Sequence, residues 1–266
     1  MVAGVCPDTE ECGVQIVQFP CLSDNFGVLI HDPKSGATAA IDVPEAGAVR
    51  AALAAEGWRL SHILVTHRHH DHIAGIAEIV AETGAKVIAP AGAADVVPGA
   101  ERYVREGDRV DVGGLSAEVW DAPGHSPDHV IYHFASDKVA FVGDVLFALG
   151  CGRVFDNDYD RMWQALARLG GLPDATALYF GHEYTVSNGR FALSVDPGNA
   201  VLQAAVAEAE AVRARGGWTS PTTVGRERAA NPFLRATDPA MAARLGLAGQ
   251  PAAAVFRELR ERKNRF

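Results

Sequence analysis

Four potential metal ligands lie within six residues at a junction between a strand and a helix. The segment T-H-R-H-H-D-H-I-A-G follows a short apolar run and contains His67, His69, Asp71 and His72. Imidazole suits zinc, iron and related metals, whereas a carboxylate adds negative charge and can orient a bound water. These are too many ligands for one closed tetrahedral site. The motif therefore indicates a centre that holds a second metal.

Three further ligand candidates lie where apolar strands end. His125 follows Pro-Gly in a tight turn, Asp144 ends the run F-V-G-D, and His182 ends the run Y-F-G-H. Taken alone, a histidine after Pro-Gly is ordinarily a turn residue, and a strand-end aspartate is more often a helix cap. Side chains at successive strand ends can, however, converge at one edge of a sandwich. Together with the 67–72 cluster, these three residues predict one metal site.

The elements that would position these ligands follow from hydrophobic periodicity and turn signals. We expect strands at residues 14–19, 27–31, 37–43, 62–65, 86–89, 116–120, 129–134, 138–142 and 177–180. We expect helices at residues 45–56, 73–83, 159–169, 199–215 and 251–263. Strands in two batches, each followed by a helix, predict two sheets packed together with helices outside. Strand signals end near residue 187, so we expect one domain at 1–186 and an α-helical domain at 187–266.

Composition limits the classes of partner. The 266 residues are 48% hydrophobic and 21% charged, as in a soluble globular protein, and carry a net charge of −9 that disfavours nucleic acid and anionic membranes. No basic segment with an apolar run opens the chain, and no apolar stretch reaches membrane-spanning length. We expect a cytoplasmic protein with reduced thiols. The cysteines in question are Cys6, Cys12, Cys21 and Cys151.

The H-x-H-x-D-H motif with single ligands at later strand ends resembles the metallo-β-lactamase superfamily. The resemblance implies an α+β fold, a four-layer αββα sandwich, here with a C-terminal helical domain. The ligands that it implies for one metal are His67, His69 and His125, those for the other are Asp71, His72 and His182, and the bridging ligand is Asp144. An anionic bridge fits two cations about 4 Å apart, which generate hydroxide at neutral pH. Asp71 and Asp144 would be catalytic, since Asp71 would also aim that hydroxide.

Further motifs narrow the resemblance to one family. They are G-D-V-L-F-A-L-G-C-G-R at 143–153, G-H-E-Y-T at 181–185, N-P-F-L-R at 231–235 and a terminal R-E-R-K at 260–263. Together they resemble the glyoxalase II (hydroxyacylglutathione hydrolase) family over nearly the whole chain. That resemblance implies hydrolysis of glutathione thioesters, typically S-D-lactoylglutathione to D-lactate and glutathione in methylglyoxal detoxification. It implies two divalent metal ions per chain, zinc first, with iron or manganese also accepted by such nitrogen and oxygen ligands.

The same resemblance assigns the glutathione-binding residues, which are Arg153, Phe155, His182, Tyr184, Arg260 and Lys263. A glycine carboxylate suits guanidinium and ammonium donors. Arg260 and Lys263 are three residues apart on a predicted helix, so both can reach one anion. Without the resemblance, a basic cluster at this position would be a solvated helix end, favoured by the helix dipole.

One position departs from the family pattern. The family often has tyrosine two residues after the basic residue of its G-C-G-[RK] segment, and this chain has Phe155 there. A phenolic hydrogen bond to glutathione would be replaced by apolar packing, at a cost on the order of 1 kcal/mol. We therefore expect KM to rise several-fold with unchanged chemistry.

Other residues near the motifs receive simpler interpretations. We expect His70 and Arg68 to point to solvent, and Cys151 to be a small packing residue because a metal hydroxide needs no cysteine nucleophile. His129 matches a recurrent second histidine after the G-H-S turn, and we interpret it as supporting the ligands from outside the coordination sphere.

Three alternatives remain for the function. The first is a mononuclear iron persulfide dioxygenase of the same fold, which would not be expected to carry the long helical C-terminal domain. The second is a β-lactamase or lactonase, against which the G-H-E-Y-T and terminal R-x-x-K features argue. The third is a non-catalytic metal scaffold or a nucleic-acid phosphodiesterase, disfavoured by the complete ligand set and the acidic charge. We therefore expect a small-molecule partner, no nucleic acid, no membrane and a monomer.

Overall fold

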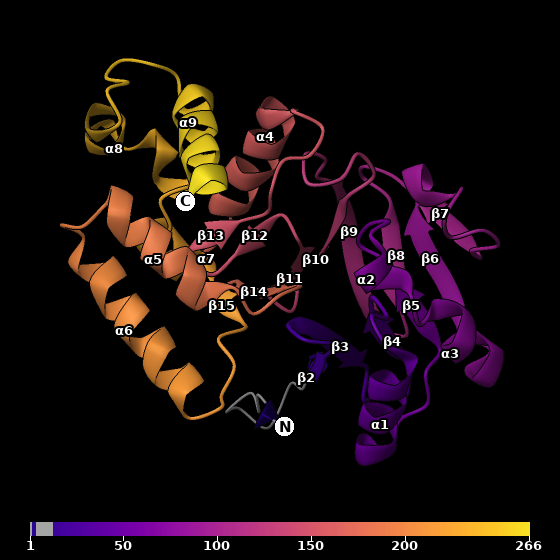
Figure 1. The fold of residues 1–266 in the computed structure, drawn as a ribbon. Coiled ribbons are helices and arrows are strands. Elements are labelled where there is room, and N and C mark those ends of the chain that lie inside the picture. The colour runs from indigo at the N-terminus through magenta and orange to yellow at the C-terminus, as the bar shows by residue number, and fades with distance from the viewer. Residues whose placement is uncertain (1, 4–12) are drawn as a thin grey trace. The chain divides into compact units, whose positions relative to one another are not determined.

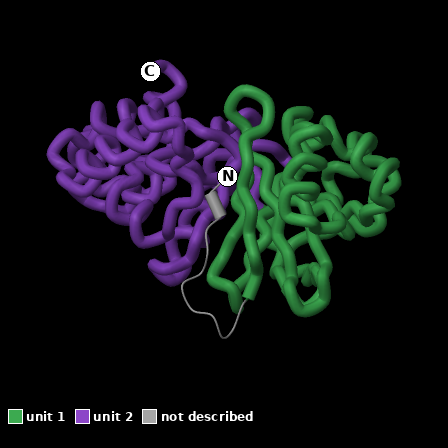
Figure 2. Tube along the Cα trace, turned by 90° about the horizontal axis from the view of Figure 1, so that it is seen from below, with its two compact units in different colours: residues 1–121, 128–143 green, residues 122–127, 144–266 purple. Residues whose placement is uncertain are grey.

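The computed structural model describes residues 2–3 and 13–266, which fall into two compact units (Figure 2). Unit 1 comprises residues 1–121 and 128–143, and unit 2 comprises residues 122–127 and 144–266. Figure 1 shows the helices and strands with their labels. Residues 186 and 187, where the sequence places a domain boundary, both belong to helix α5 (Thr185–Val195) of unit 2. That boundary stays a prediction.

The first sheet of unit 1 has the strand order β1-β2-β3-β4-β5-β6-β7 among the described residues. Its strands are β1 (Val2–Ala3), β2 (Gln15–Cys21), β3 (Asn25–His31), β4 (Thr38–Ile41), β5 (His62–Leu64), β6 (Lys86–Pro90) and β7 (Arg102–Val104). Pairing is antiparallel from β1 to β4 and parallel from β4 to β7. Parallel neighbours need crossover connections. The crossover from β4 to β5 contains α1 (Ala46–Glu56), and that from β5 to β6 contains α2 (His70–Ile73) and α3 (Ile76–Thr83). The crossover from β6 to β7 contains only a short 3-10 helix.

The helices of these crossovers cover the first sheet through one apolar cluster. Val49 and Leu53 of α1 and Ile79 of α3 are buried in it with Leu29 and Ile63 of the strands. A buried leucine or isoleucine contributes roughly 1.5–3 kcal/mol relative to full exposure. This cluster therefore supports the strand β5, whose carboxyl end carries the histidine motif.

The second sheet of unit 1 is an antiparallel meander in the order β11-β10-β9-β8. Its strands are β8 (Arg109–Val112), β9 (Leu115–Asp121), β10 (Val130–Phe134) and β11 (Val139–Gly143), and unit 1 also has the 3-10 helix η1 (Ala91–Ala93). Every residue of β10 and β11 is buried. The buried Tyr132 hydroxyl donates to the Val65 carbonyl (2.8 Å), and the Val130 amide donates to the Thr66 carbonyl (2.9 Å). These two bonds tie the second sheet to the start of the histidine motif.

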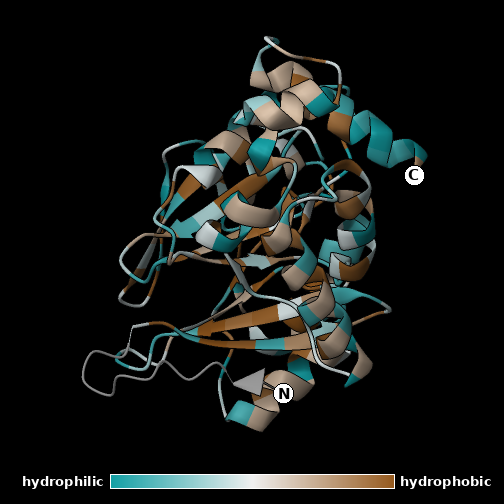
Figure 3. Cartoon of the chain, turned by 90° about the vertical axis from the view of Figure 1, so that its left-hand side faces the viewer, coloured by the Kyte–Doolittle hydropathy of each residue, from teal (hydrophilic) through white to brown (hydrophobic). Residues whose placement is uncertain are grey.

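Unit 2 consists mainly of helices around short strands. Its helices are α4 (Tyr159–Gly170), α5, α6 (Ala200–Ala214), α7 (Val224–Ala230), η2 (Leu234–Thr237), α8 (Pro239–Arg244) and α9 (Ala252–Arg265). Its strands are β12 (Leu146–Phe147), β13 (Gly150–Cys151), β14 (Ala177–Phe180) and β15 (Thr222–Thr223). The pairs β12–β13 and β14–β15 are antiparallel. The last turns of α9 are hydrophilic in Figure 3. Nearer the start of α9, the buried Phe256 packs against Trp163 of α4.

The strands and helices predicted from periodicity are confirmed, with one interruption. The helix expected at 73–83 is split into α2 and α3, with Gly75 between them. A Cβ on Gly75 would lie 2.5 Å from the Ala46 amide nitrogen, and the Gly75 amide donates to the Val43 carbonyl (2.9 Å). Packing against the start of α1 therefore breaks the helix at a residue that has no side chain.

The strands β7, β8, β12, β13 and β15 were missed, because two to four residues carry little periodicity. The helices α5, α7 and α8 were missed as well, although α5 has 11 residues. Within the described part of the chain, no helix is long and apolar enough to cross a membrane. Cys21 and Cys151 are buried free thiols, in line with the expectation, whereas Cys6 and Cys12 lie outside the described residues.

Candidate metal centre

The loop between β5 and α2 holds the first ligand candidates in close contact. His67 is fully buried, and its Nε2 lies 3.0 Å from Nδ1 of His69. Two ligand atoms that share a tetrahedral zinc at about 2.0–2.1 Å lie about 3.3 Å apart. The spacing of these two nitrogens therefore suits a shared metal.

A carboxylate that the sequence did not nominate holds the neighbouring histidine. Asp42 accepts hydrogen bonds from the amide (2.7 Å) and hydroxyl (2.7 Å) of Thr66, and its Oδ2 lies 2.8 Å from Nδ1 of His72. A proton on Nδ1 that is donated to Asp42 leaves the Nε2 lone pair for a metal. Asp42 is buried and follows β4, the parallel neighbour of β5. An acid at the end of the strand beside the motif strand was the available signal.

Asp71 is oriented by a second residue that the sequence did not nominate. The side-chain amide of Asn25 donates to the Asp71 carbonyl (3.1 Å) and to Oδ2 of its carboxylate (3.2 Å). The same Oδ2 lies 3.9 Å from Nε2 of His72. The side chain of Asp71 is 43% exposed, so this carboxylate is both held and open to solvent.

Unit 2 brings its three ligand candidates together around one oxygen atom. Oδ2 of the buried Asp144 lies 3.2 Å from Nε2 of His125 and 3.3 Å from Nε2 of His182. Nδ1 of His125 lies 3.0 Å from the Arg153 carbonyl, which can only accept, so the proton of the neutral ring is on Nδ1. The lone pair on Nε2 then faces a carboxylate oxygen. A cation between the two atoms would relieve their repulsion, so these donors fit a metal ion.

Two positions beside the ligand candidates have room only for glycine, because neighbouring atoms pack closely against the backbone there. Gly143 has φ +48°, and a Cβ there would lie 2.6 Å from Nε2 of His129 and 2.8 Å from the Thr66 hydroxyl oxygen. His129 is buried and stacks on His67, with ring centroids 4.6 Å apart. This contact with a ligand candidate fits the supporting role expected for His129. In unit 2, a Cβ on Gly152 would lie 1.9 Å from the Asp144 carbonyl oxygen.

The aromatic candidates of unit 2 lie beside its histidines. Tyr184 stacks on His182 with ring centroids 4.8 Å apart, and it is 36% exposed. The Phe155 ring lies 5.5 Å from that of His125, and the Arg153 guanidinium lies 5.8 Å from the centre of the Phe155 ring. Phe155 is 55% exposed, and Arg153 is exposed as well. Both are therefore available to a ligand.

The two basic candidates of α9 differ in environment. Arg260 is buried, and its Nη1 donates to the carbonyls of Cys151 (2.8 Å) and Gly152 (3.3 Å), while its Nε donates to Asn264 (3.1 Å). Lys263 is half-buried, and burial together with Arg260 lowers the pKa of its ammonium group to about 8. Arg260 thus supports the segment before Arg153, and Lys263 is charged only below about pH 8.

Three simpler expectations have mixed outcomes. His70 is exposed, as expected. The expectation for Arg68 is wrong, because its guanidinium donates to the Gly92 carbonyl (2.8 Å) and pairs with Asp95. Carboxylate and carbonyl acceptors beside the motif hold this side chain back from solvent. Burial raises the pKa of the Cys151 thiol, which fits a packing role.

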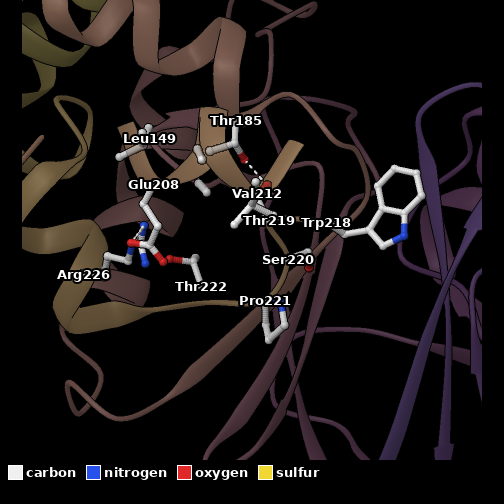
Figure 4. A pocket seen from close by; sticks show the side chains of 12 residues that line it. Leu149, Thr185, Glu208, Val212, Trp218, Thr219, Ser220, Pro221, Thr222 and Arg226 are labelled. Carbon is white, nitrogen blue, oxygen red and sulfur yellow. Dashed lines mark hydrogen bonds and ion pairs between the residues drawn. The ribbon is translucent and has the colours of Figure 1, made fainter. Parts of the chain in front are cut away.

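A cavity of about 150 Å³ in unit 2 contains none of the residues that the sequence nominated (Figure 4). Its walls include Leu149, Trp218 and Thr222, and its rim carries the ion pair between Arg226 and Glu208 (2.9 Å). Because it offers neither a histidine nor an unshared carboxylate, it is not the metal centre.

Models of known protein families and several known proteins match this chain. Residues 32–182 match the model of the metallo-beta-lactamase superfamily, and residues 183–266 match that of the hydroxyacylglutathione hydrolase C-terminus. A hydroxyacylglutathione hydrolase of Methylobacterium sp. (strain 4-46) is 55% identical over 253 residues, covering 95% of this chain and 99% of the relative. That of Rhizobium meliloti (strain 1021) is 51% identical over 248 residues, covering 93% and 97%.

Solved structures share the fold. ETHE1 from Myxococcus xanthus is 26% identical with a TM-score of 0.67, covering 94% of this chain and 91% of that one. The BLEG-1 B3 metallo-beta-lactamase is 20% identical with a TM-score of 0.63, covering 83% and 99%. The predicted metallo-β-lactamase sandwich with a helical C-terminal region is confirmed. With its histidine and aspartate clusters, the chain binds divalent metal.

The hydrogen bond from Asp42 predicts a change of tautomer in the variant Asp42→Asn. The amide oxygen can still accept from the Thr66 amide, which places the NH₂ group against Nδ1 of His72. An NH₂ donor there forces the His72 proton onto Nε2, the nitrogen needed by a metal. We expect metal affinity, measured by chelator competition, to fall about 10–100-fold.

The matched control is Asp32→Asn, which removes a buried carboxylate that accepts from Lys34, Ser35 and Gly114 instead of a histidine. We expect this control to lower the melting temperature and leave metal affinity unchanged. Equal metal affinity in Asp42→Asn and the wild type would contradict the assigned role of Asp42.

Proposed function

The chain belongs to the hydroxyacylglutathione hydrolase family of the metallo-β-lactamase superfamily, and from this premise we propose that it hydrolyses glutathione thioesters. Water cleaves S-D-lactoylglutathione into D-lactate and glutathione. The observation that carries the proposal is the Asp144 oxygen held between His125 and His182, in a chain that matches hydroxyacylglutathione hydrolases over 95% of its length. The match of residues 183–266 argues against the persulfide dioxygenase alternative, which is not expected to carry that helical region.

The proposed centre holds two divalent ions, with zinc as the first choice and iron or manganese as alternatives. The proposed ligands are His67, His69 and His125 for one ion, Asp71, His72 and His182 for the other, and Asp144 for both. The family motif supports this division, and so do donor spacings of 3.0, 3.2 and 3.3 Å within the two units. When bound, the ions would supply a nucleophile from water at neutral pH and polarise the thioester carbonyl.

The chain's own residues would orient that chemistry. Asp71 would accept a hydrogen bond from the attacking water through Oδ2, and Asn25 holds this oxygen in place. Asp42 would keep the His72 proton on Nδ1. The leaving group is a thiolate, so no protein side chain has to donate a proton while the carbon–sulfur bond breaks.

We assign glutathione binding to the proposed α-helical domain, residues 187–266, together with loops of the catalytic domain, residues 1–186. Arg153, Phe155 and Tyr184 are exposed enough to contact it. Nε and Nη1 of Arg260 already donate within the protein, so this residue would offer only Nη2, beside the ammonium group of Lys263. We also propose that the enzyme is cytoplasmic and monomeric, and its net charge of −9 disfavours a nucleic-acid partner.

The direct test is the loss of thioester absorbance when S-D-lactoylglutathione is added to protein of known metal content. The variant Asp144→Asn removes the charge that two cations would share. We expect its metal content to fall from two ions to one or fewer and kcat to fall by more than about 100-fold, since even outer partners of ligands are worth 10–100-fold. Full activity with two ions in this variant would exclude the bridging role, and no turnover by fully loaded wild type would exclude the substrate.

The lowered pKa of Lys263 predicts a pH dependence of substrate binding. The group is protonated below about pH 8 and neutral above it, so its attraction for a substrate carboxylate is present at low pH and lost as pH rises. We expect kcat/KM to decline above about pH 8 through KM, and Lys263→Arg to abolish the decline because guanidinium stays charged. A wild-type KM that is constant to pH 9.5 would remove Lys263 from the binding site.

Phe155 predicts a gain from the variant Phe155→Tyr. The added hydroxyl on this exposed ring can donate one hydrogen bond to glutathione, worth about 1 kcal/mol, or about fivefold. We expect KM to fall by that factor and kcat to stay constant. The control Phe155→Leu keeps an apolar side chain and should leave KM at or above the wild-type value; an unchanged KM in Phe155→Tyr would show that glutathione does not reach this position.

A further inference from the structure

The hairpin of β12 and β13 connects two proposed functional residues. Asp144 lies two residues before β12, and Arg153 lies two residues after β13. Each strand has only two residues, and such a short hairpin is not stable by itself in water. Leu149 in its turn has φ +58°, a left-handed conformation that a non-glycine residue adopts only when its surroundings enforce it. Something outside the hairpin must therefore hold it.

Two buried side chains from the helical region supply that support. Glu227 of α7 accepts a hydrogen bond from the Leu149 amide (2.8 Å). Asn231, which follows α7, donates through Nδ2 to the carbonyls of Phe147 (3.2 Å) and Gly150 (2.9 Å). Its Nδ2 also lies 2.9 Å from Oε2 of Glu227, so the two side chains support each other. We call Glu227 and Asn231 the hairpin clamp.

Both residues of the hairpin clamp are shielded from solvent. Glu227 and Asn231 are both 0% exposed, and the Thr222 hydroxyl donates to the other Glu227 oxygen, Oε1 (2.6 Å). Leu149 and Thr222 also form part of the wall of the 150 Å³ cavity, as Figure 4 shows. No salt bridge to Glu227 occurs among the described residues, and burial raises the pKa of its carboxyl. A buried polar group of this kind is retained only where its hydrogen bonds are all made.

The hairpin contacts residues of the proposed centre within unit 2. The Phe147 ring makes edge contacts with His182 (6.1 Å between centroids) and Tyr184 (5.4 Å). The Gly152 amide donates to the Val145 carbonyl (3.2 Å), beside Asp144. A shift of the hairpin would therefore displace a proposed bridging ligand, a proposed terminal ligand and an aromatic contact together.

We propose that Glu227 and Asn231 are positioning residues of the hydrolase: they fix the β12–β13 hairpin and thereby set Asp144, His182 and Arg153 for metal and substrate. The proposal rests on the proposed function for its catalytic consequence. It assigns a task to the N-P-F-L-R motif and to α7 that does not involve contact with substrate.

The first test is Asn231→Leu, a variant of similar size that removes both hydrogen bonds to the hairpin carbonyls. We expect faster amide hydrogen exchange in residues 145–153, fewer metal ions per folded chain, and a kcat that falls at least tenfold with a smaller change in KM. The matched control is Arg244→Met, which breaks the ion pair with the buried Asp196 in the same helical region and leaves the hairpin alone. We expect the control to lower the melting temperature only.

Glu227 allows a conservative rescue. In Glu227→Gln the amide can turn its oxygen towards the Leu149 amide and Asn231, and its NH₂ group can donate to the Thr222 hydroxyl oxygen. We therefore expect Glu227→Gln to retain exchange protection, metal content and kcat within about threefold, whereas Glu227→Leu loses all three.

The outcomes separate the clamp from general stability and from the proposed substrate. If Asn231→Leu does not fold, Thr222→Val replaces it, because it removes the hydroxyl that donates to Oε1 of Glu227 (2.6 Å) and nearly keeps the size of the side chain. Normal exchange and metal content per folded chain in the clamp variants would overturn the positioning role. Hydrogen exchange and metal content need no substrate, so they test the clamp even if S-D-lactoylglutathione is not hydrolysed.

Discussion

The proposed site depends on holding nitrogen and oxygen atoms that carry lone pairs close to one another. Asp144 Oδ2 lies 3.2 Å from His125 Nε2 and 3.3 Å from His182 Nε2, and His67 Nε2 lies 3.0 Å from His69 Nδ1. Where two such atoms face each other with lone pairs, as Nε2 of His125 faces Oδ2 of Asp144, they repel unless a proton or a metal cation lies between them. The protein must therefore hold each group in position by its other atoms. Asp42 does so for His72, and the Arg153 carbonyl does so for His125.

The sequence pointed to the ligand candidates, which form local patterns, and missed the residues that hold other groups through contacts with distant parts of the chain. His67, His69, Asp71 and His72 form a dense local pattern, and His125, Asp144 and His182 each follow a recognisable strand, so residue type and spacing nominate them. Asp42, Asn25 and Glu227 act through contacts with residues 24 to 78 positions away along the chain. No local pattern encodes such contacts. Only Asp42 left a trace, as an acid at the end of the strand next to the motif strand.

Long periodic elements were equally predictable, and tertiary packing decided the exceptions. The strands of both sheets and the helices α1, α4, α6 and α9 follow from hydrophobic periodicity. The helix expected at 73–83 breaks at Gly75 because the start of α1 approaches too closely for a side chain. Arg68 was expected to face solvent and Arg260 to bind glutathione, yet both donate to backbone carbonyls of distant segments. Arginine has five donors, and burial among carbonyl groups satisfies several of them at once.

The helical C-terminal region, to which we assign glutathione binding, also supports the β12–β13 hairpin. Arg260 of α9 donates to the carbonyls of Cys151 and Gly152, and Glu227 and Asn231 hold residues 147, 149 and 150. The Leu149 amide and the carbonyls of Phe147, Ala148, Gly150 and Cys151 are thus all bonded to side chains of residues 188–260. A hairpin with two-residue strands has little rigidity of its own. The helical region therefore supplies the order of the hairpin and the placement of the residues on both sides of it, which gives its buried Glu227 and Asn231 a structural task.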